Sequence, residues 1–265
     1  MEARLGPVLD VLDDGADAPL AVLALARVPF ITHGSVRVAC RRLNAIIASR
    51  AFREWRVERG LAEYGLVVAG GQRGGRALAE CSVFTGGRWR AITPMSGPRM
   101  RACSAIVEDE DGQPEMWVMG GHGAGGDFLA TVEAYNPRTN TWRSCLPLSQ
   151  RRVGAVAGVV GGRLVVAGGH GGFGVGRLTS VEAYTPTGWT PLPPLPHAAV
   201  SATACVLNGR LYVMGSWNSN KLQVLEMTEE NGLSWSCKAD LLSLIHISEP
   251  TRQAEISYAV FCLKK

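Results

Sequence analysis

The sequence predicts a mainly β fold built from repeated antiparallel sheets, with a small α-helical segment at the N-terminus. Two observations predict the sheets: an apolar run ending in glycine recurs along the chain, and a tryptophan closes each repeat. A third observation, apolar residues at helical spacing before the repeats, predicts the helical segment. The chain has 265 residues, of which 46% are apolar and 19% charged, so it is long enough for a globular protein with a sizeable core.

The first segment, residues 1–62, is rich in helix formers, and its apolar residues could form the core of a small helical bundle. The apolar stretch 18–31 is too short to span a bilayer, and acidic residues precede it where a signal peptide needs positive charge. The seven cysteines are scattered without zinc-site spacing, which is typical of a reducing compartment. We therefore expect a cytoplasmic and/or nuclear protein.

The repeats follow, with the marker glycine recurring every 47 to 50 residues. In the third repeat, "VGAVAGVV", "RLVVAGG", "SVEAYTP" and "WTPL" read as four short strands joined by turns. We expect the glycine pairs to lie where a Cβ would clash or φ must be positive, and the aromatic residues to fill the space between sheets. These repeat positions are Gly70, Gly71, Gly120, Gly121, Gly168, Gly169, Tyr135, Tyr184, Trp89, Trp142, Trp189 and Trp235.

The third repeat also contains the spacing G-x-G-x-x-G, at Gly169, Gly171 and Gly174. This spacing binds a dinucleotide when it follows a strand and opens a helix within a βαβ unit. Here it leads into another predicted strand, and the same spacing recurs one repeat earlier. The pattern therefore indicates turn glycines, and we expect no cofactor.

The repeats, over residues 63–240, resemble the kelch repeat. The resemblance implies a β-propeller, incomplete here with three full blades and part of a fourth. One kelch-like group carries copper oxidase chemistry, but the chain lacks a recognisable set of Tyr and His ligands. His122 and His170 occupy equivalent loop positions without a third ligand, and no catalytic motif is present. We expect neither a metal site nor enzymatic activity.

The helical segment resembles the F-box of plant-type F-box/kelch proteins. "ALARVP" and "VRVACRRLNAIIASRAF" carry this resemblance, with Leu43 where the family usually has Trp. The family's opening Leu-Pro-Asp is absent, and residues 16–18 stand near its place. The resemblance implies binding to a Skp-type adaptor, and through it to a cullin scaffold, by Leu20, Leu23, Leu25, Val28, Pro29, Val36 and Cys40. The alternative is a helical cap that binds no adaptor.

Topology predicts one binding face on the repeats. In a four-stranded antiparallel blade, the linkers that lead into each repeat and the loops after the glycine pairs share one end. Exposed cations and aromatic residues there would suit an acidic or phosphorylated segment of a client protein. We expect this face to carry Arg73, Arg99, Arg101, His122, Phe128, Arg151, Arg152, His170, Phe173 and His197. The alternative is that these arginines pack their stems and are merely solvated.

The sequence thus predicts a non-catalytic, substrate-recruiting adaptor of an SCF-type ubiquitin ligase with an unidentified client. The alternative is a kelch-repeat interaction scaffold, for example cytoskeletal or signalling, with no ligase link. A net charge of +4 without a basic run does not favour nucleic acid, and we expect no membrane partner.

The repeat pattern stops after Trp235, and residues 241–265 differ from it. Read back into codons, residues 242–252 resemble the end sequence of a transposon-based sequencing library, and "ISYAVFCL" resembles the constant sequence that follows an index. We therefore predict that the chain is truncated and carries a non-native, adapter-encoded tail. The alternative is a genuine strand, since "ISYAVFCL" is apolar enough to form one.

Overall fold

The structure is a computed structural model that describes residue 52 and residues 64–109, 112–216, 219–228, 232–237 and 259–264. Within these residues the regular structure is almost entirely β-strand, in four four-stranded antiparallel sheets and one short hairpin. Apart from Phe52, the predicted helical segment 1–62 lies outside the described residues, and so does most of the predicted tail 241–265. No helix of the described part is long and apolar enough to cross a membrane.

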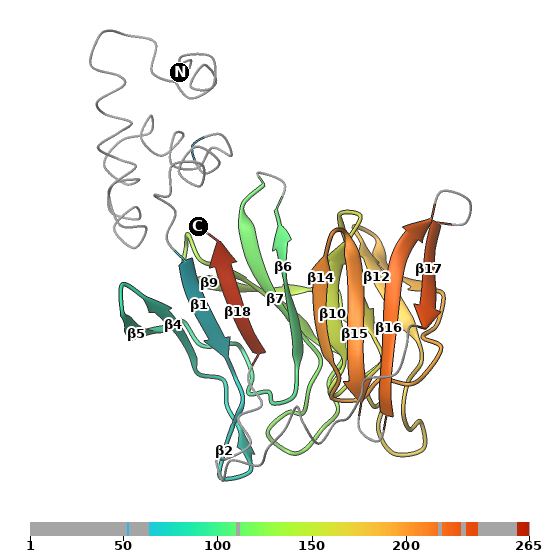
Figure 1. Cartoon of the computed structure of the whole chain (residues 1–265). Helices are drawn as coiled ribbons and strands as arrows, with labels where there is room; N and C mark the ends of the chain where they lie inside the picture. The colour runs from blue at the N-terminus through green and yellow to red at the C-terminus, as the bar shows by residue number, and fades with distance from the viewer. Residues whose placement is uncertain are drawn as a thin grey trace, which may run out of the picture.

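Three sheets are each formed by a continuous stretch of chain, with the strands side by side in chain order (Figure 1). Blade 2 contains β6 (Cys103–Glu108), β7 (Pro114–Met119), β8 (Val132–Asn136) and β9 (Thr141–Cys145). Blade 3 contains β10 (Val156–Val160), β11 (Arg163–Ala167), β12 (Val181–Thr185) and β13 (Gly188–Leu192). Blade 4 contains β14 (Thr203–Leu207), β15 (Arg210–Ser216), β16 (Ser219–Thr228) and β17 (Gly232–Cys237).

Blade 1 differs because it combines two distant segments of the chain. Its strands, from the inside outward, are β18 (Ala259–Lys264), β1 (Tyr64–Ala69), β4 (Cys81–Thr85) and β5 (Arg88–Ile92). A two-stranded hairpin, β2 (Gln72–Arg73) and β3 (Arg76–Ala77), projects from the loop after β1. Since β18 lies beside β6, β6 beside β10, and β10 beside β14, the inner strands of successive blades are neighbours. The predicted mainly β fold with four-stranded blades is confirmed, but the expectation that the fourth repeat forms only part of a blade is wrong, because β14 to β17 form a complete four-stranded sheet.

The partial blade is the first in the chain, because β1, β4 and β5 lack an inner strand of their own. Residues 259–264 supply it by pairing antiparallel with the full length of β1, from Tyr64 opposite Lys264 to Ala69 opposite Ala259. This pairing corresponds to the strand alternative for the last residues of the chain. The adapter origin of residues 241–265 stays a prediction.

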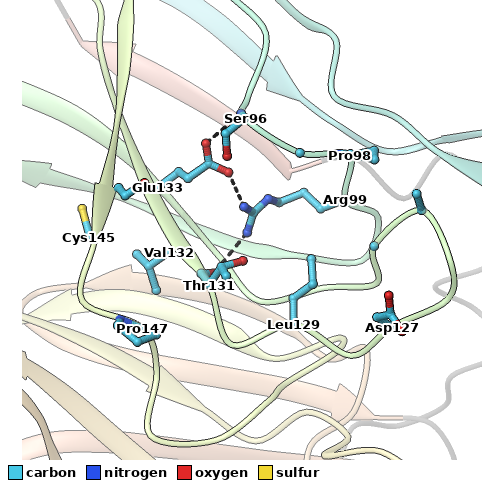
Figure 2. Close-up of a pocket in the computed structure, with 14 residues that line it drawn as sticks. Ser96, Pro98, Arg99, Asp127, Leu129, Thr131, Val132, Glu133, Cys145 and Pro147 are labelled. Atoms are coloured by element: carbon cyan, nitrogen blue, oxygen red, sulfur yellow. Dashed lines mark hydrogen bonds and ion pairs between the residues drawn. The ribbon is translucent and has the colours of Figure 1, made fainter.

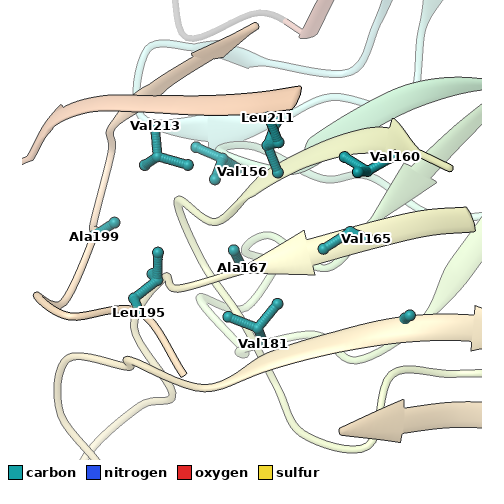
Figure 3. Packing of buried hydrophobic residues seen from close by; sticks show 10 residues of the cluster. Val156, Val160, Val165, Ala167, Val181, Leu195, Ala199, Leu211 and Val213 are labelled. Carbon is teal, nitrogen blue, oxygen red and sulfur yellow. The ribbon is translucent and has the colours of Figure 1, made fainter. Parts of the chain in front are cut away.

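Blades 2 and 3 are buried on both faces, which explains why their second strands are almost continuously apolar. In β11, Leu164 and Val166 pack toward blade 2, whereas Val165 and Ala167 pack toward blade 4. Figure 3 shows the second pair in a cluster with Leu211 and other residues of the next repeat. Because successive side chains of a strand point to opposite faces, both sets must be apolar. The hydrophobic core therefore lies between the blades.

The paired glycines follow the second strand in blades 1, 2 and 3. Gly120 has φ +65°, and a Cβ at this position would overlap the carbonyl oxygen of Arg152 in the linker that leads into blade 3. The N–H of Gly121 donates to that same carbonyl at 2.8 Å. Gly168 and Gly169 repeat this arrangement with the carbonyl of Ala199. The glycines are thus required by the close approach of a linker.

The tryptophans of the fourth strands tie each blade to the linker that precedes it. The indole Nε1–H of Trp142 donates to the carbonyl of Thr93 at 2.8 Å, and Trp189 and Trp235 make the equivalent bonds to Leu146 and Pro193. The three indole rings are half-buried and pack against the apolar clusters between blades, while their N–H groups find carbonyl acceptors. Trp89, in blade 1, is 52% exposed.

We predict that Gly120→Ala lowers the free energy of unfolding by about 2 kcal/mol or more, because the added methyl group is strained at positive φ and meets a backbone oxygen. Gly97→Ala is the matched control, since Gly97 has no positive φ and open space around the added atom. Urea denaturation of the two variants measures the difference. Equal midpoints would contradict the role assigned to Gly120.

Candidate functional site

Two of the arginines predicted for the binding face are buried. Arg152 is only 1% exposed and lies in the linker between blades 2 and 3. Its Nε–H donates to Oε1 of Glu182 at 2.8 Å, and its Nη1 donates to the carbonyls of Gly168 and Ser180 at 2.7 and 2.9 Å. All three partners belong to blade 3, whereas the Arg152 backbone N–H bonds to the Leu129 carbonyl in blade 2. Arg152 therefore links two blades.

Arg99 occupies the equivalent position between blades 1 and 2 and is 3% exposed. Figure 2 shows its guanidinium between the Glu133 carboxylate, with which it forms an ion pair, and the Thr131 carbonyl, to which it donates at 3.1 Å. The expectation that Arg99 and Arg152 are exposed is therefore wrong. Their charges are used to satisfy buried carboxylate and carbonyl groups of the next blade, which the sequence pattern of a linker arginine does not reveal.

At the junction between blades 3 and 4, both positions of this ion pair carry uncharged residues. Ala199 stands where the earlier linkers have arginine, and Gln223 stands where β8 and β12 have glutamate. Gln223 is 1% exposed, and its Oε1 accepts from the His197 N–H at 2.8 Å. Glu133 and Glu182 accept in the same way from the N–H groups of Ser96 and Ser149. The loss of the arginine thus coincides with the loss of the buried negative charge.

We predict that Arg152→Ala lowers the free energy of unfolding by about 3–5 kcal/mol, because it leaves the Glu182 carboxylate buried without its cation. The double variant Arg152→Ala/Glu182→Gln reproduces the residues of blade 4 and should recover a large part of this loss. A double-mutant cycle by urea denaturation gives the coupling. Additive effects of the two single substitutions would contradict an ion-pair role.

The remaining eight predicted face residues divide into two groups. Arg101, His122, Phe128 and His170 line one pocket of about 290 Å³, together with Val153, Arg177, Val200 and Ser201; we call this the axial pocket. Arg73, Arg151, Phe173 and His197 are exposed and do not line it. Among the described residues the structure therefore brings together four of the predicted side chains.

Backbone pairing positions the axial pocket. His122 is bridged to Met100 and Phe128, and His170 is bridged in the same manner to Val153 and Arg177. Arg177 thus occupies in blade 3 the place that Phe128 has in blade 2. Sequence reasoning missed Arg177 because the loop of blade 3 is one residue longer, which shifts the two positions out of alignment.

Aromatic contacts extend from the axial pocket to the surface. The ring of Phe128 lies 4.6 Å from that of His122 and 5.7 Å from that of His170, measured between centroids. The ring centroid of Phe128 also lies 6.2 Å from that of Phe173. Phe173 is 99% exposed, so this contact connects the pocket to the protein surface. Val175 in the same loop is also exposed. An exposed apolar group of this kind beside a pocket is typical of a binding surface.

A second pocket, of about 460 Å³, lies where the linker between blades 1 and 2 meets the loop that follows β7. Figure 2 shows Leu129, Val132 and Pro147 around the Arg99–Glu133 ion pair at this pocket. Asp127 also lines it, so the second pocket has charges of both signs. The axial pocket instead has two arginines and no carboxylate among its lining residues.

The glycine-rich loop between β11 and β12 leads from one strand to the next. It therefore lacks the helix that a dinucleotide-binding loop opens. No cluster of three or more His, Cys, Asp or Glu side chains that could hold a metal is present in the described part of the chain.

The thiols of two buried cysteines, Cys81 and Cys103, have raised pKa values. Burial is the main cause that raises the pKa of the Cys103 thiol to about 12 and that of Cys81 to about 11, from an ordinary value of 9.0. A buried thiol in such surroundings is chemically inert.

We predict that stability falls as the pH rises from about 9 toward 12. The unfolded chain releases the Cys103 proton near its ordinary pKa of 9.0, whereas the folded protein still holds it, so deprotonation favours unfolding. Cys103→Ala should lower this slope by up to about 1.4 kcal/mol per pH unit. Urea denaturation at several alkaline pH values measures both slopes, and equal slopes would contradict the raised pKa.

A model of the Kelch motif family matches residues 113–148 and 151–196, which contain β7 to β9 and β10 to β13. The solved structure of YjhT is similar to this chain with a TM-score of 0.54 and 17% identity, over 66% of this chain and 65% of that one. At this identity the likeness concerns the fold alone, and it agrees with the kelch-type blades.

Sequence relatives include proteins that combine kelch repeats with an F-box. An F-box/kelch-repeat protein of Arabidopsis thaliana is 27% identical over 262 residues, which are 95% of this chain and 65% of the relative. The F-box protein AFR of Arabidopsis thaliana is 26% identical over 216 residues, which are 78% of this chain and 56% of the relative. The chain thus spans less than two thirds of each relative's length. The kelch motifs and these similarities support a protein-interaction role.

Proposed function

We propose that this kelch-repeat protein recruits a substrate to an SCF-type ubiquitin ligase. In this proposal residues 1–62 bind a Skp-type adaptor, which connects to a cullin scaffold, and the blades bind the client protein. The observation that carries the proposal is the similarity to an F-box/kelch-repeat protein over 95% of the chain, which extends beyond the kelch blades into the preceding segment.

The blades support the client-binding half of the proposal. The linkers and the loops after the glycine pairs place Arg101, His122, Phe128 and His170 around one pocket, with Phe173 exposed beside it. Arg99 and Arg152 are excluded from the client face because they are buried between blades. The proposed face therefore consists of the axial pocket and the exposed side chains around it.

An adaptor of this kind acts by holding two proteins close together, so the role that we propose is non-catalytic. The Skp-type adaptor and the cullin work in the cytoplasm and nucleus, where we expect this protein. A kelch scaffold without a ligase link is the second candidate, and the missing Leu-Pro-Asp near residues 16–18 favours it.

We predict that the full chain captures a purified Skp-type adaptor and that Leu25→Asp weakens the capture at least about tenfold, because a carboxylate would be buried in an apolar helix contact. Arg163→Asp is the matched control, since Arg163 is exposed at the turn between β10 and β11. Co-precipitation with titrated adaptor provides the measurement. If the wild-type chain captures no adaptor, the scaffold function replaces the ligase function.

A further inference from the structure

The axial pocket is positively charged and has a defined size. Arg101 and Arg177 line it from opposite linker and loop segments, and none of its lining residues is acidic. A volume of about 290 Å³ accommodates a side chain or a short peptide turn. The pocket therefore favours a small anionic group.

Arg101 is held in a backbone conformation that is costly for arginine. Its φ is +54°, and the equivalent residues of the next two linkers are Gly154 at +62° and Ser201 at +52°. The three residues are joined in line, since the Gly154 N–H donates to the Arg101 carbonyl at 2.9 Å and the Ser201 N–H donates to the Gly154 carbonyl at 2.8 Å. Glycine would occupy this position without strain. Strain at a pocket-lining residue is typical of a functional constraint.

The walls of the pocket add a hydrogen-bond donor and apolar surface. The Gly172 N–H donates to Nδ1 of His170 at 3.1 Å, which leaves Nε2 as the ring nitrogen that can donate. Ser201 adds a hydroxyl group, and Val153 and Val200 add apolar surface. Beside the pocket, the fully exposed Phe173 contacts Phe128 of the wall.

We propose that the axial pocket binds the carboxylate of an acidic side chain of a client peptide, while an apolar side chain next to it in the peptide packs against Phe173 and Phe128. Arg101 and Arg177 pair with the carboxylate, as arginine commonly does. A rigid exposed aromatic ring then contributes apolar contact area. This inference rests on the proposed client-binding function of the blades and names the chemistry that they recognise.

The test uses the full chain and fluorescein-labelled octapeptides with a central Glu-Phe pair between glycine and serine flanks. Fluorescence polarisation should show saturable binding that weakens from roughly 0.05 M to roughly 0.3 M NaCl, because screening weakens exposed ion pairs. Peptides with Gln-Phe or Glu-Ser in place of Glu-Phe should bind at least about tenfold more weakly. A phosphoserine-Phe peptide tests phosphate as the alternative anion.

Three variants with matched controls locate the binding. Arg101→Gly removes the guanidinium and relieves the strained backbone, so it should lose at least about tenfold in peptide affinity, with its urea midpoint measured alongside. Arg177→Glu and Phe173→Ala change exposed side chains and should have the same effect on affinity. The controls are Asn208→Gly, Arg163→Glu and Leu207→Ala. They lie in or next to the turns at the opposite end of the blades and should bind like the wild type.

The proposal is overturned if the Glu-Phe and Gln-Phe peptides bind equally, if neither binds, or if the phosphoserine peptide binds more tightly. The proposal is also overturned if a pocket variant keeps its urea midpoint and binds the Glu-Phe peptide as tightly as its control variant does. Capture of the Skp-type adaptor is measured separately on the same variants. If the wild-type chain captures the adaptor but does not bind the Glu-Phe peptide, this inference alone is rejected, whereas peptide binding without adaptor capture by the wild-type chain would reject the ligase function alone.

Discussion

A single linker arginine joins blade 1 to blade 2 and another joins blade 2 to blade 3, and the arrangement of these blades depends on them. The Arg152 backbone bonds to blade 2, through the Leu129 carbonyl and the Gly121 N–H, while its side chain bonds to Glu182 and two carbonyls of blade 3. A buried ion pair with all of these groups satisfied fixes the distance and the angle between the two sheets. The apolar clusters between blades then contribute most of the burial, but they have no comparable directional preference.

The same junction explains the glycine pairs. The linker carbonyl approaches so closely that only glycine fits at positions such as Gly120, and its N–H partner is the next glycine. Blade 4 retains this backbone contact at Ala199 although the ion pair is absent. The backbone contact is therefore common to the junctions, and the arginine is an addition that requires a glutamate in the third strand.

The linkers also build the axial pocket two residues after this junction. The chain reverses there with positive φ at Arg101, Gly154 and Ser201, and these residues line or adjoin the pocket. Since the blades fix the linkers, the pocket is held by rigid strands, while the loop carrying Phe173 projects from it. A rigid scaffold with side chains presented by loops is a common arrangement for protein recognition.

The sequence by itself determined the repeat, the strand pattern and the end of the blades that carries the linkers and the loops after the glycine pairs. It could do so because alternation, glycine pairs and tryptophans are local patterns that recur from repeat to repeat. It did not separate buried from exposed linker arginines. Arg99 and Arg101 are two residues apart and identical in type, yet the first is buried against Glu133 and the second lines the axial pocket. Only the tertiary structure decided this, because the partner of Arg99 lies more than thirty residues away on another strand and the backbone reversal at Arg101 depends on contacts with the next linker. The sequence also did not reveal Arg177 as a pocket residue, because its place in the axial pocket follows from backbone pairing with His170 and not from its position in the sequence.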